Sequence, residues 1–259
     1  MSERRPAPYP LRMVAHITGP LYWERVGQEG PTLVLLHPLP HDLTCWRATD
    51  DAAPRGPAIV VGLSVGAVAA KHMASQRPEQ VRALVLTGGG YYGAGRPNLP
   101  VAKGIAPLHV PRYRSAGLAY RREHFSRNFT NGFVGSAIYR YLLDVAVGRG
   151  GDAEGIVRLL LAVEEPDPPG LHSGIRAPTL IVTGGEDRSR GAQEEMARRI
   201  TGAELRVIDG AGHCCNLERP AEYDRHVLGF IAGLRLLSGE AVADAPRPTE
   251  LRARPRGSD

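Results

Sequence analysis

Short runs of consecutive apolar residues recur along the chain and do not alternate with polar residues. An uninterrupted run of this length predicts a strand that is buried on both faces of a sheet. Four such runs are present, at 32–36, 58–61, 83–89 and 179–185, and a fifth strand of the sheet is predicted at 204–209, where charged residues interrupt the apolar ones. Two short strands are predicted before them, at 13–18 and 21–26, joined by Gly19-Pro20, a pair that favours a turn.

Helical patterns separate these runs. A run of small residues follows Ser64 as far as Met73, and helices are predicted over 134–147, 153–165, 193–200 and 222–237. Buried strands alternating with helices predict an α/β fold with a mostly parallel, doubly wound sheet. Residues 90–176 contain no comparable strand and predict a helical insertion.

The same pattern divides the chain into segments. Residues 13–89 and 177–237 form the predicted core, and 90–176 the helical insertion between its halves. Residues 1–12 are rich in proline and arginine and are expected to be flexible. Residues 238–259 have too little apolar content to fold and are expected to be disordered.

Composition narrows the class of protein. A chain of 259 residues with 42% hydrophobic and 23% charged residues is typical of one soluble globular domain. The net charge of +5 comes from 30 arginines and two lysines spread along the chain, which does not favour a nucleic-acid-binding element. Binding of nucleic acid through the arginine-rich tail is kept only as a minor hypothesis.

The sequence also bears on the cellular compartment of the protein and on its cofactors. The three cysteines show neither a disulfide framework nor metal-ligand spacing, so a reducing cytoplasm and no metal are expected. The first residues lack the apolar stretch of a signal peptide and no apolar run in the sequence is long enough to cross a membrane, so neither a signal peptide nor membrane association is expected. Nothing in the sequence indicates an oligomeric state.

Three chemically active residues fall at predicted strand ends. Ser64 follows the run at 58–61, Asp187 follows 179–185, and His213 follows 204–209. In parallel sheets, function concentrates at the carboxyl ends of the strands, so we expect these side chains to meet. Serine, histidine and aspartate together make an activated nucleophile with its base and orienting acid.

The segment Gly62-Leu-Ser-Val-Gly66 lies between a predicted strand and a predicted helix. A tight turn there holds the serine in a strained backbone conformation at a helix N-terminus. The two flanking glycines let neighbouring segments approach without a clash at Cβ. The plainer alternative is an ordinary glycine turn between a strand and a helix.

With these motifs, residues 13–237 resemble the α/β-hydrolase superfamily, in its soluble bacterial esterase and lactonase-like branch. The matching pieces are Leu35-Leu-His37, Gly62 to Gly66, Gly184-Gly-Glu-Asp187 and Gly210-Ala-Gly-His-Cys-Cys-Asn-Leu-Glu-Arg-Pro220. The resemblance implies a cofactor-free serine hydrolase in which Ser64 is the nucleophile, His213 the base and Asp187 the acid. It also implies an oxyanion hole made by the backbone N–H groups of Val65 and Leu39, and a cap formed by residues 90–176.

The chain departs from that family between His37 and Ser64, which are only 27 positions apart. A strand, its loop and a helix are missing in comparison with the family. We therefore expect an open sheet edge and an uncovered apolar patch beside residues 33–36, with a short crossover helix at 41–49. Pro38, where the family has glycine, stiffens this loop. A natural shortened variant and a poorly folding deletion both remain open.

Several neighbouring residues have competing interpretations. Glu186 competes with Asp187 for the role of the acid, and the second position suits the family pattern better. His37 and His41 are expected to have structural roles in their loop, and Asp209 to be a turn residue. Cys214 and Cys215 are expected to be buried as small apolar side chains.

Two functions follow from these residues. The first is a serine hydrolase that cleaves a small carboxylic ester, thioester or lactone through an acyl-enzyme. The second is a protein of the same fold that does not hydrolyse, but eliminates, cyclises or only binds; the shortened segment motivates it. Position 64 is serine, which disfavours the branches of the family with an aspartate nucleophile.

The charge of the helical insertion bears on the charge of the substrate. Nine lysines and arginines lie between residues 90 and 150, against only Glu123 and Asp144. This excess indicates either a solvated basic face or the recognition of an acidic small-molecule substrate or carrier protein. Eight aromatic residues of this region are expected mostly in the core of the cap, with some facing the pocket: Tyr91, Tyr92, Tyr113, Tyr120, Phe125, Phe129, Phe133 and Tyr139.

Overall fold

The computed structural model of the chain describes residues 12–17, 19–23, 33–37, 57–93, 104–148 and 152–237. Some of the sequence predictions fall on residues outside these ranges. They are the oxyanion donor Leu39, the residues Pro38 and His41, the helix over 41–49, and the terminal segments 1–11 and 238–259.

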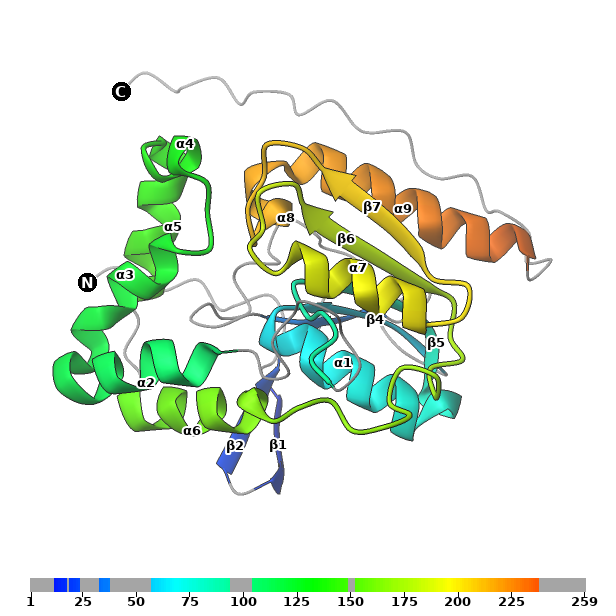
Figure 1. Cartoon of the computed structure of the whole chain (residues 1–259), viewed down its shortest axis with the longest axis horizontal. Coiled ribbons are helices and arrows are strands. Elements are labelled where there is room, and N and C mark those ends of the chain that lie inside the picture. Colours follow the sequence, from blue (N-terminus) through cyan, green and yellow to red (C-terminus); the bar gives the residue numbers. More distant parts are fainter. Residues whose placement is uncertain are drawn as a thin grey trace, which may run out of the picture.

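A five-stranded parallel sheet forms the centre of the fold, in the order β3-β4-β5-β6-β7 (Figure 1). Its strands are β3 (Leu33–Leu36), β4 (Ala58–Leu63), β5 (Val81–Thr87), β6 (Thr179–Gly184) and β7 (Glu204–Ile208). All six residues of β4 and of β6 are buried, which explains their unbroken apolar runs. The predicted α/β class and the five predicted strands are confirmed.

Helices cover both faces of the sheet. Helices α1 (Val65–Gln76) and α7 (Arg190–Arg199) lie on one face, where small residues of α1 pack on Val60 and Leu84. Helix α9 (Pro220–Leu237) lies on the other face with the short helix α8 (Cys215–Glu218). This double covering removes both faces of the central strands from water, and the layers are visible in Figure 1.

Helices also occupy the insertion, which we call the cap. Its elements are α2 (Ile105–Ala116), η3 (Gly117–Tyr120), α3 (Arg121–Ser126), α4 (Asn131–Val134), α5 (Ala137–Gly148) and α6 (Ala153–Glu164). They lie together on one side of the molecule (Figure 1). Helices α2 and α6 share an apolar cluster that includes Val110, Tyr113 and Leu160. No strand occurs among the described residues of 90–176, as expected.

Some boundaries predicted from the sequence are wrong. The helix expected over 134–147 is present as α5 but begins at Ala137, because Val134 ends the separate short helix α4 and the chain breaks at Gly135-Ser136. The strand expected over 21–26 is β2 (Gly19–Trp23), which pairs antiparallel with β1 (Arg12–Ile17). Gly19 and Pro20 therefore begin a strand instead of forming the connection, a position where an edge strand tolerates proline.

Strand β3 lies at an edge of the sheet, as the shortened segment predicts. Among the described strands its neighbour is β4 alone, with Leu33 opposite Ile59 and Leu36 opposite Gly62. All four residues of β3 are only partly buried, whereas those of β4 are fully buried. Within the described strands, the sheet therefore ends at the position that the sequence indicated.

Candidate active site

Ser64 occupies a strained turn between β4 and α1. Its backbone has φ 56° and ψ −114°, and it is the one non-glycine residue with positive φ in the described part of the chain. Its N–H donates a hydrogen bond to the carbonyl of Thr87 at 2.7 Å, which ties the turn to β5. Strain of this kind persists only where the surrounding structure imposes it and is concentrated at functional sites.

The glycines on either side of Ser64 are required by close backbone approaches. A Cβ added to Gly62 would lie 2.5 Å from the carbonyl oxygen of Gly66, and one added to Gly66 would lie 2.1 Å from that of Leu36. Gly66 therefore lets α1 pack directly against the edge strand β3. The predicted elbow is present, and it makes contact with the part of the sheet where the chain is short.

His213 and Asp187 form a hydrogen-bonded pair beside this turn. Nδ1 of His213 lies 3.0 Å from Oδ2 of Asp187. Asp187 is buried and also accepts bonds from the N–H and hydroxyl of Ser189 and from the amide of Gln193. Glu186 is exposed, so the acid that contacts His213 is Asp187, the second of the two acidic residues.

The pair shifts the pKa of both partners. Burial opposes ionisation of Asp187, but the charge and hydrogen bond of His213 and the bonds from Ser189 outweigh it and hold the pKa of Asp187 below its usual value. Burial also disfavours the imidazolium, yet the charge of Asp187 and its hydrogen bond raise the pKa of His213 above 6.5. The site is thus arranged to stabilise a positive charge on His213.

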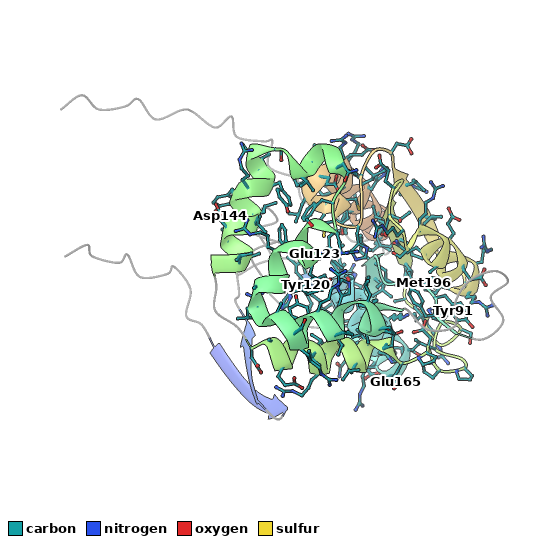
Figure 2. All side chains as sticks on the ribbon, turned by 60° about the vertical axis from the view of Figure 1, so that its left-hand side comes forward. Tyr91, Tyr120, Glu123, Asp144, Glu165 and Met196 are labelled. Atoms are coloured by element: carbon teal, nitrogen blue, oxygen red, sulfur yellow. The ribbon has the colours of Figure 1, made fainter. Side chains whose placement is uncertain are left out.

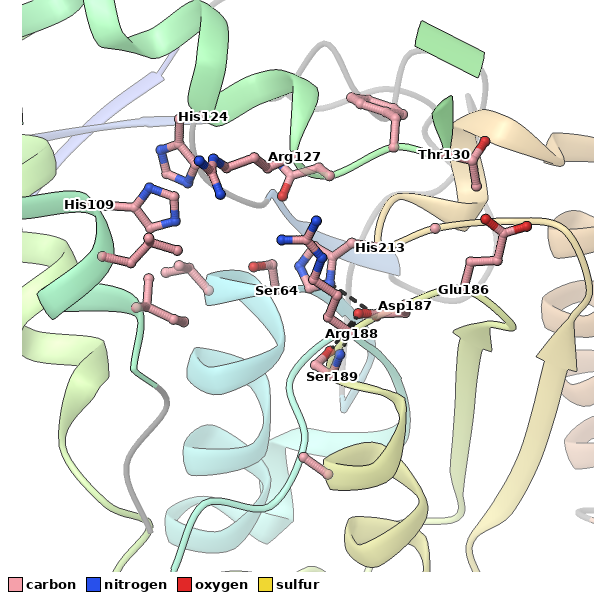
Figure 3. A pocket seen from close by; sticks show the side chains of 18 of the residues that line it. Ser64, His109, His124, Arg127, Thr130, Glu186, Asp187, Arg188, Ser189 and His213 are labelled. Atoms are coloured by element: carbon pink, nitrogen blue, oxygen red, sulfur yellow. Dashed lines mark hydrogen bonds and ion pairs between the residues drawn. The ribbon is translucent and has the colours of Figure 1, made fainter. Parts of the chain in front are cut away.

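A pocket of about 440 Å³ lies between the sheet and the cap. Ser64 and His213 line it from the sheet side, and His109, His124 and Arg127 from the cap side. Figure 3 shows Ser64 between these two groups, with its hydroxyl turned toward the pocket. Among the described residues no hydrogen bond joins this hydroxyl to His213; such bonds are often long before substrate binds.

One of the two predicted oxyanion donors can be located. Val65 is the first residue of α1 and also lines the pocket. Its N–H belongs to the first turn, where N–H groups have no partner within the helix and the helix dipole favours negative charge. The other predicted donor, Leu39, lies outside the described residues. His37, at the end of β3, is exposed.

Three residues that the sequence analysis passed over support the pair. Gln193 is fully buried and bridges the N–H of Gly88 and Asp187, both at 2.8 Å. Gly88 has φ +73°, and a Cβ there would lie 2.5 Å from the ring of His213. Glu218 accepts bonds from Gly212, next to His213, and from Thr130 of the cap. Glu218 lies in the segment 210–220 that carried the family resemblance, but its contacts with Gly212 and Thr130 were not predicted from it.

Two histidines on the cap are held by tyrosines. Nδ1 of His109 lies 2.9 Å from the hydroxyl of Tyr120, and Nδ1 of His124 lies 2.9 Å from that of Tyr113. The two rings stack with their centroids 3.9 Å apart. Burial and the nearby cation of Arg127 lower the pKa of His109 to about 4, so its ring is neutral near pH 7.

A buried ion pair joins the sheet layer to the chain that returns from the cap. The ammonium of Lys71, on α1, bonds to Asp167 at 2.8 Å and to the carbonyl of Gly90 at 2.9 Å. Asp167 also accepts the N–H of Tyr92, and both members of the pair are buried. Burial opposes ionisation of Asp167, but the charge of Lys71 keeps its pKa below the usual value. The sequence offered no sign of this contact.

The remaining predictions concern packing. Cys214 and Cys215 are fully buried free thiols, as expected, and burial raises the pKa of Cys215. Asp209 lies in the turn after β7. Of the aromatic residues, two line the pocket and four are buried in the cap: Tyr92 and Phe129, and Tyr113, Tyr120, Phe125 and Tyr139.

Within the described ranges, no three histidine, cysteine, aspartate or glutamate side chains are grouped so that they could hold a metal ion. The helices in those ranges also include none that is both long and apolar enough to span a membrane.

Comparison with families finds a match to the model of the "Alpha/beta hydrolase family" over residues 18–225. A similar curated protein is the 2-hydroxy-6-oxononadienedioate/2-hydroxy-6-oxononatrienedioate hydrolase of Burkholderia vietnamiensis, 30% identical over 186 residues, covering 68% of this chain and 62% of the relative. Another is the pimeloyl-[acyl-carrier protein] methyl ester esterase of Neisseria meningitidis, 27% identical over 202 residues, covering 73% and 62%. The chain thus matches less than two thirds of the length of these relatives.

Solved structures share the fold. An esterase from Thermogutta terrifontis superposes with a TM-score of 0.68 at 20% identity, covering 88% of this chain and 99% of the other. The enol-lactonase from Burkholderia xenovorans superposes with a TM-score of 0.64 at 19% identity, covering 79% and 92%. At these identities the likeness concerns the fold alone.

Proposed function

Because the chain belongs to the alpha/beta hydrolase family, we propose that it is a serine hydrolase that cleaves a small carboxylic ester, thioester or lactone. The observation that carries this proposal is the strained backbone of Ser64 in the same pocket as the hydrogen-bonded pair His213–Asp187. A serine held this way next to a base is the arrangement that nucleophilic catalysis needs.

The reaction proceeds in two steps. In the first, the Ser64 oxygen attacks the substrate carbonyl, Nε2 of His213 takes the hydroxyl proton, and the same proton then passes to the leaving oxygen or sulfur. Asp187 stabilises the imidazolium that forms, consistent with the raised pKa of His213. In the second step His213 takes a proton from water, whose oxygen attacks the acyl carbonyl; the bond from the acyl group to Ser64 breaks, the proton returns from His213 to the Ser64 oxygen, and the acid is released.

The N–H of Val65 is the described donor for the oxyanion. Negative charge on the carbonyl oxygen develops at the N-terminus of α1, where the helix dipole favours it. The N–H of Leu39 is the second donor in this proposal. Each donor contributes roughly 10²–10³ to the rate in comparable sites, so the position of the Leu39 loop affects the rate strongly.

The names of the relatives support an acyl substrate with an acidic group. The Burkholderia relative is named for a dioate, a compound with a carboxylate at each end. The Neisseria relative is named for an ester of a pimeloyl group on a carrier protein. Together with the excess of basic residues between 90 and 150, these names favour a small acidic acyl compound as substrate.

A specific observation favours a second candidate function. Among the described residues, β3 is the last strand of the sheet on its side, and the hydroxyl of Ser64 makes no hydrogen bond to His213. A protein of this fold that eliminates, cyclises or only binds would have the same pocket without a competent nucleophile. The two candidates differ in whether Ser64 forms a covalent acyl intermediate.

The direct test is hydrolysis of a panel of p-nitrophenyl esters, thioesters and lactones by the wild type and by Ser64→Ala. We expect turnover of at least one class by the wild type and a loss of several orders of magnitude in the variant. Ser173→Ala, an exposed serine outside the pocket, is the matched control and should keep wild-type activity. Turnover that survives Ser64→Ala would contradict the proposal.

A further inference from the structure

The cap wall of the pocket carries polar groups that the proposed hydrolysis does not use. His109 on α2, His124 on α3 and Arg127 just after α3 all line the pocket on the side opposite His213 (Figure 3). Buried polar groups are normally paired, so a polar wall facing an apolar acyl chain would be costly. A substrate with a polar group at this end would therefore suit the wall better than a fully apolar acyl chain.

The hydrogen bond between Tyr120 and His109 leaves His109 with a donor for the pocket. The hydroxyl of Tyr120 lies 2.9 Å from Nδ1 of His109, and the nearby positive charge of Arg127 favours the arrangement in which this hydroxyl donates its proton to Nδ1. A neutral imidazole that accepts at Nδ1 carries its proton on Nε2. Within the described chain, Nδ1 alone of the two ring nitrogens is hydrogen-bonded, so Nε2–H remains for a ligand.

Arg127 adds positive charge to the wall. One of its terminal nitrogens pairs with Glu123 at 2.8 Å, while its Nε is buried and has no hydrogen-bond partner. Arg112 pairs with the same carboxylate, so two arginines share one acid. Figure 2 labels Tyr120 and Glu123 on the helices of the cap, and Met196 and Tyr91 on the other side of the same view. The wall keeps one net positive charge, which favours an anion.

We infer that His109 and Arg127 form a subsite that binds a carboxylate at the far end of the acyl chain, while the ester carbonyl lies at Ser64. His124 supports it by stacking on His109. The subsite rests on the proposed function and gives it a substrate class, the monoesters of dicarboxylic acids. Hydrogen bonds from a charged donor to a carboxylate contribute about 10- to 100-fold in affinity or kcat/KM.

A matched substrate pair tests this subsite. The mono-p-nitrophenyl esters of succinic, glutaric and adipic acid are compared with the esters in which an uncharged amide replaces the distal carboxylate. We expect the wild type to prefer the carboxylate of the best chain length by about 10-fold or more in kcat/KM. Equal kcat/KM for both members of every pair would overturn the subsite and leave the hydrolase proposal intact.

Substitutions test which residues cause the preference for the distal carboxylate. Arg127→Met should abolish it by lowering kcat/KM on the carboxylate ester about 10- to 100-fold, with little change on the amide ester. His109→Gln should lower it less, because glutamine still offers an amide donor. Arg122→Met is the matched control, since Arg122 is an exposed arginine of α3, the helix that ends just before Arg127, and does not line the pocket. An equal loss in Arg122→Met would show a general charge effect and refute the subsite.

A binding measurement separates this inference from the hydrolase proposal. Calorimetry with the free dicarboxylates and with their monoamides uses Ser64→Ala, which needs no turnover. We expect the dicarboxylate to bind more tightly than its monoamide, and Arg127→Met to remove the difference. If no ester is turned over but this difference is found, the subsite stands and the hydrolase proposal fails. If the difference is absent, the subsite fails.

Discussion

Two histidines line one pocket from opposite sides and have opposite electrostatic settings. His213, on the sheet side, contacts the carboxylate of Asp187 through Nδ1, and the pKa of His213 is raised. His109, on the cap side, contacts a neutral phenol through Nδ1 and lies near arginines, and the pKa of His109 falls to about 4. Both rings are largely removed from water, so the partner of Nδ1 and the surrounding charge decide the difference.

This electrostatic difference suits the two sides of the pocket to different functions. A histidine beside a carboxylate can accept a proton and hold the resulting charge, which is what a general base does. A neutral histidine held by a tyrosine keeps one proton on a fixed nitrogen, which suits recognition of an oxygen atom. In this account the sheet side supplies chemistry and the cap side supplies selection of substrate.

The strongest way to break the comparison is to give His213 a neutral partner. Asp187→Asn does so, and we expect kcat for the best ester to fall by roughly 10⁴, because the amide favours the wrong tautomer and does not stabilise imidazolium. Asp209→Asn, in the exposed turn after β7, is the control. A loss of less than 10-fold in Asp187→Asn would mean that the pair is not part of the catalytic machinery.

A second substitution tests the buried ion pair that joins the sheet layer to the chain returning from the cap. Lys71→Met leaves Asp167 buried without its cation, and we expect the free energy of unfolding to fall by about 3–5 kcal/mol. Urea unfolding measures this loss. The double variant with Asp167→Asn should be less destabilised than the sum of both single variants, because the uncompensated charge is gone. Strict additivity would show that the two side chains do not interact.

The dependence of the free energy of unfolding on pH distinguishes the two histidines. The folded pKa of His109, and likewise that of buried His172, is about 4, below the unfolded value of 6.5. The unfolded state therefore binds more protons, and stability falls as pH drops from 6.5 toward 4, by up to about 3 kcal/mol for each histidine. His213 has the opposite sign, since its stabilising contribution is present below 6.5 and is lost as pH rises through its raised pKa.

The measurement is urea unfolding between pH 7.5 and 4.5, with His109→Gln as the comparison. This variant should lose less stability than the wild type over the same interval, because one of the two histidines no longer titrates. Identical slopes for both proteins would show that His109 does not titrate with a lowered pKa.

The smallest expected effect is a shift of the pH profile of kcat/KM. The profile of kcat/KM reports groups of the free enzyme, and His213 must be neutral to act as a base. Because its pKa is raised, the acid limb should have its midpoint above 6.5. Removing the negative charge in Asp187→Asn should move the residual limb to lower pH. A wild-type midpoint near 4 would assign the limb to a group other than His213.

The sequence was informative about the sheet side of the pocket. Ser64, Asp187 and His213 follow apolar strands, and parallel strands bring their carboxyl ends to one edge, so local patterns were enough to bring these residues together. That the described strands of the sheet end at β3 was also predictable, because it follows from the number of residues between His37 and Ser64.

The cap side and the supporting contacts were not predictable. His109 lies on α2, a helix that contains Pro107 and Pro111, and proline argues against a helix in any local analysis. Lys71 occurs in a run of small residues with no acidic neighbour, and its partner Asp167 is 96 positions away. Gln193 is one of many polar helix residues until the fold places it between Gly88 and Asp187. Contacts between distant segments leave no local pattern.

The central claim is that Ser64 is a nucleophile activated in an assembled site. The most direct measurement is intact-mass analysis after treatment with a fluorophosphonate, applied to the wild type, Ser64→Ala and the control Ser173→Ala. The account predicts a single adduct on the wild type and on the control, and none on Ser64→Ala. A wild-type protein that is folded by circular dichroism and forms no adduct would contradict it, and would favour the function without hydrolysis.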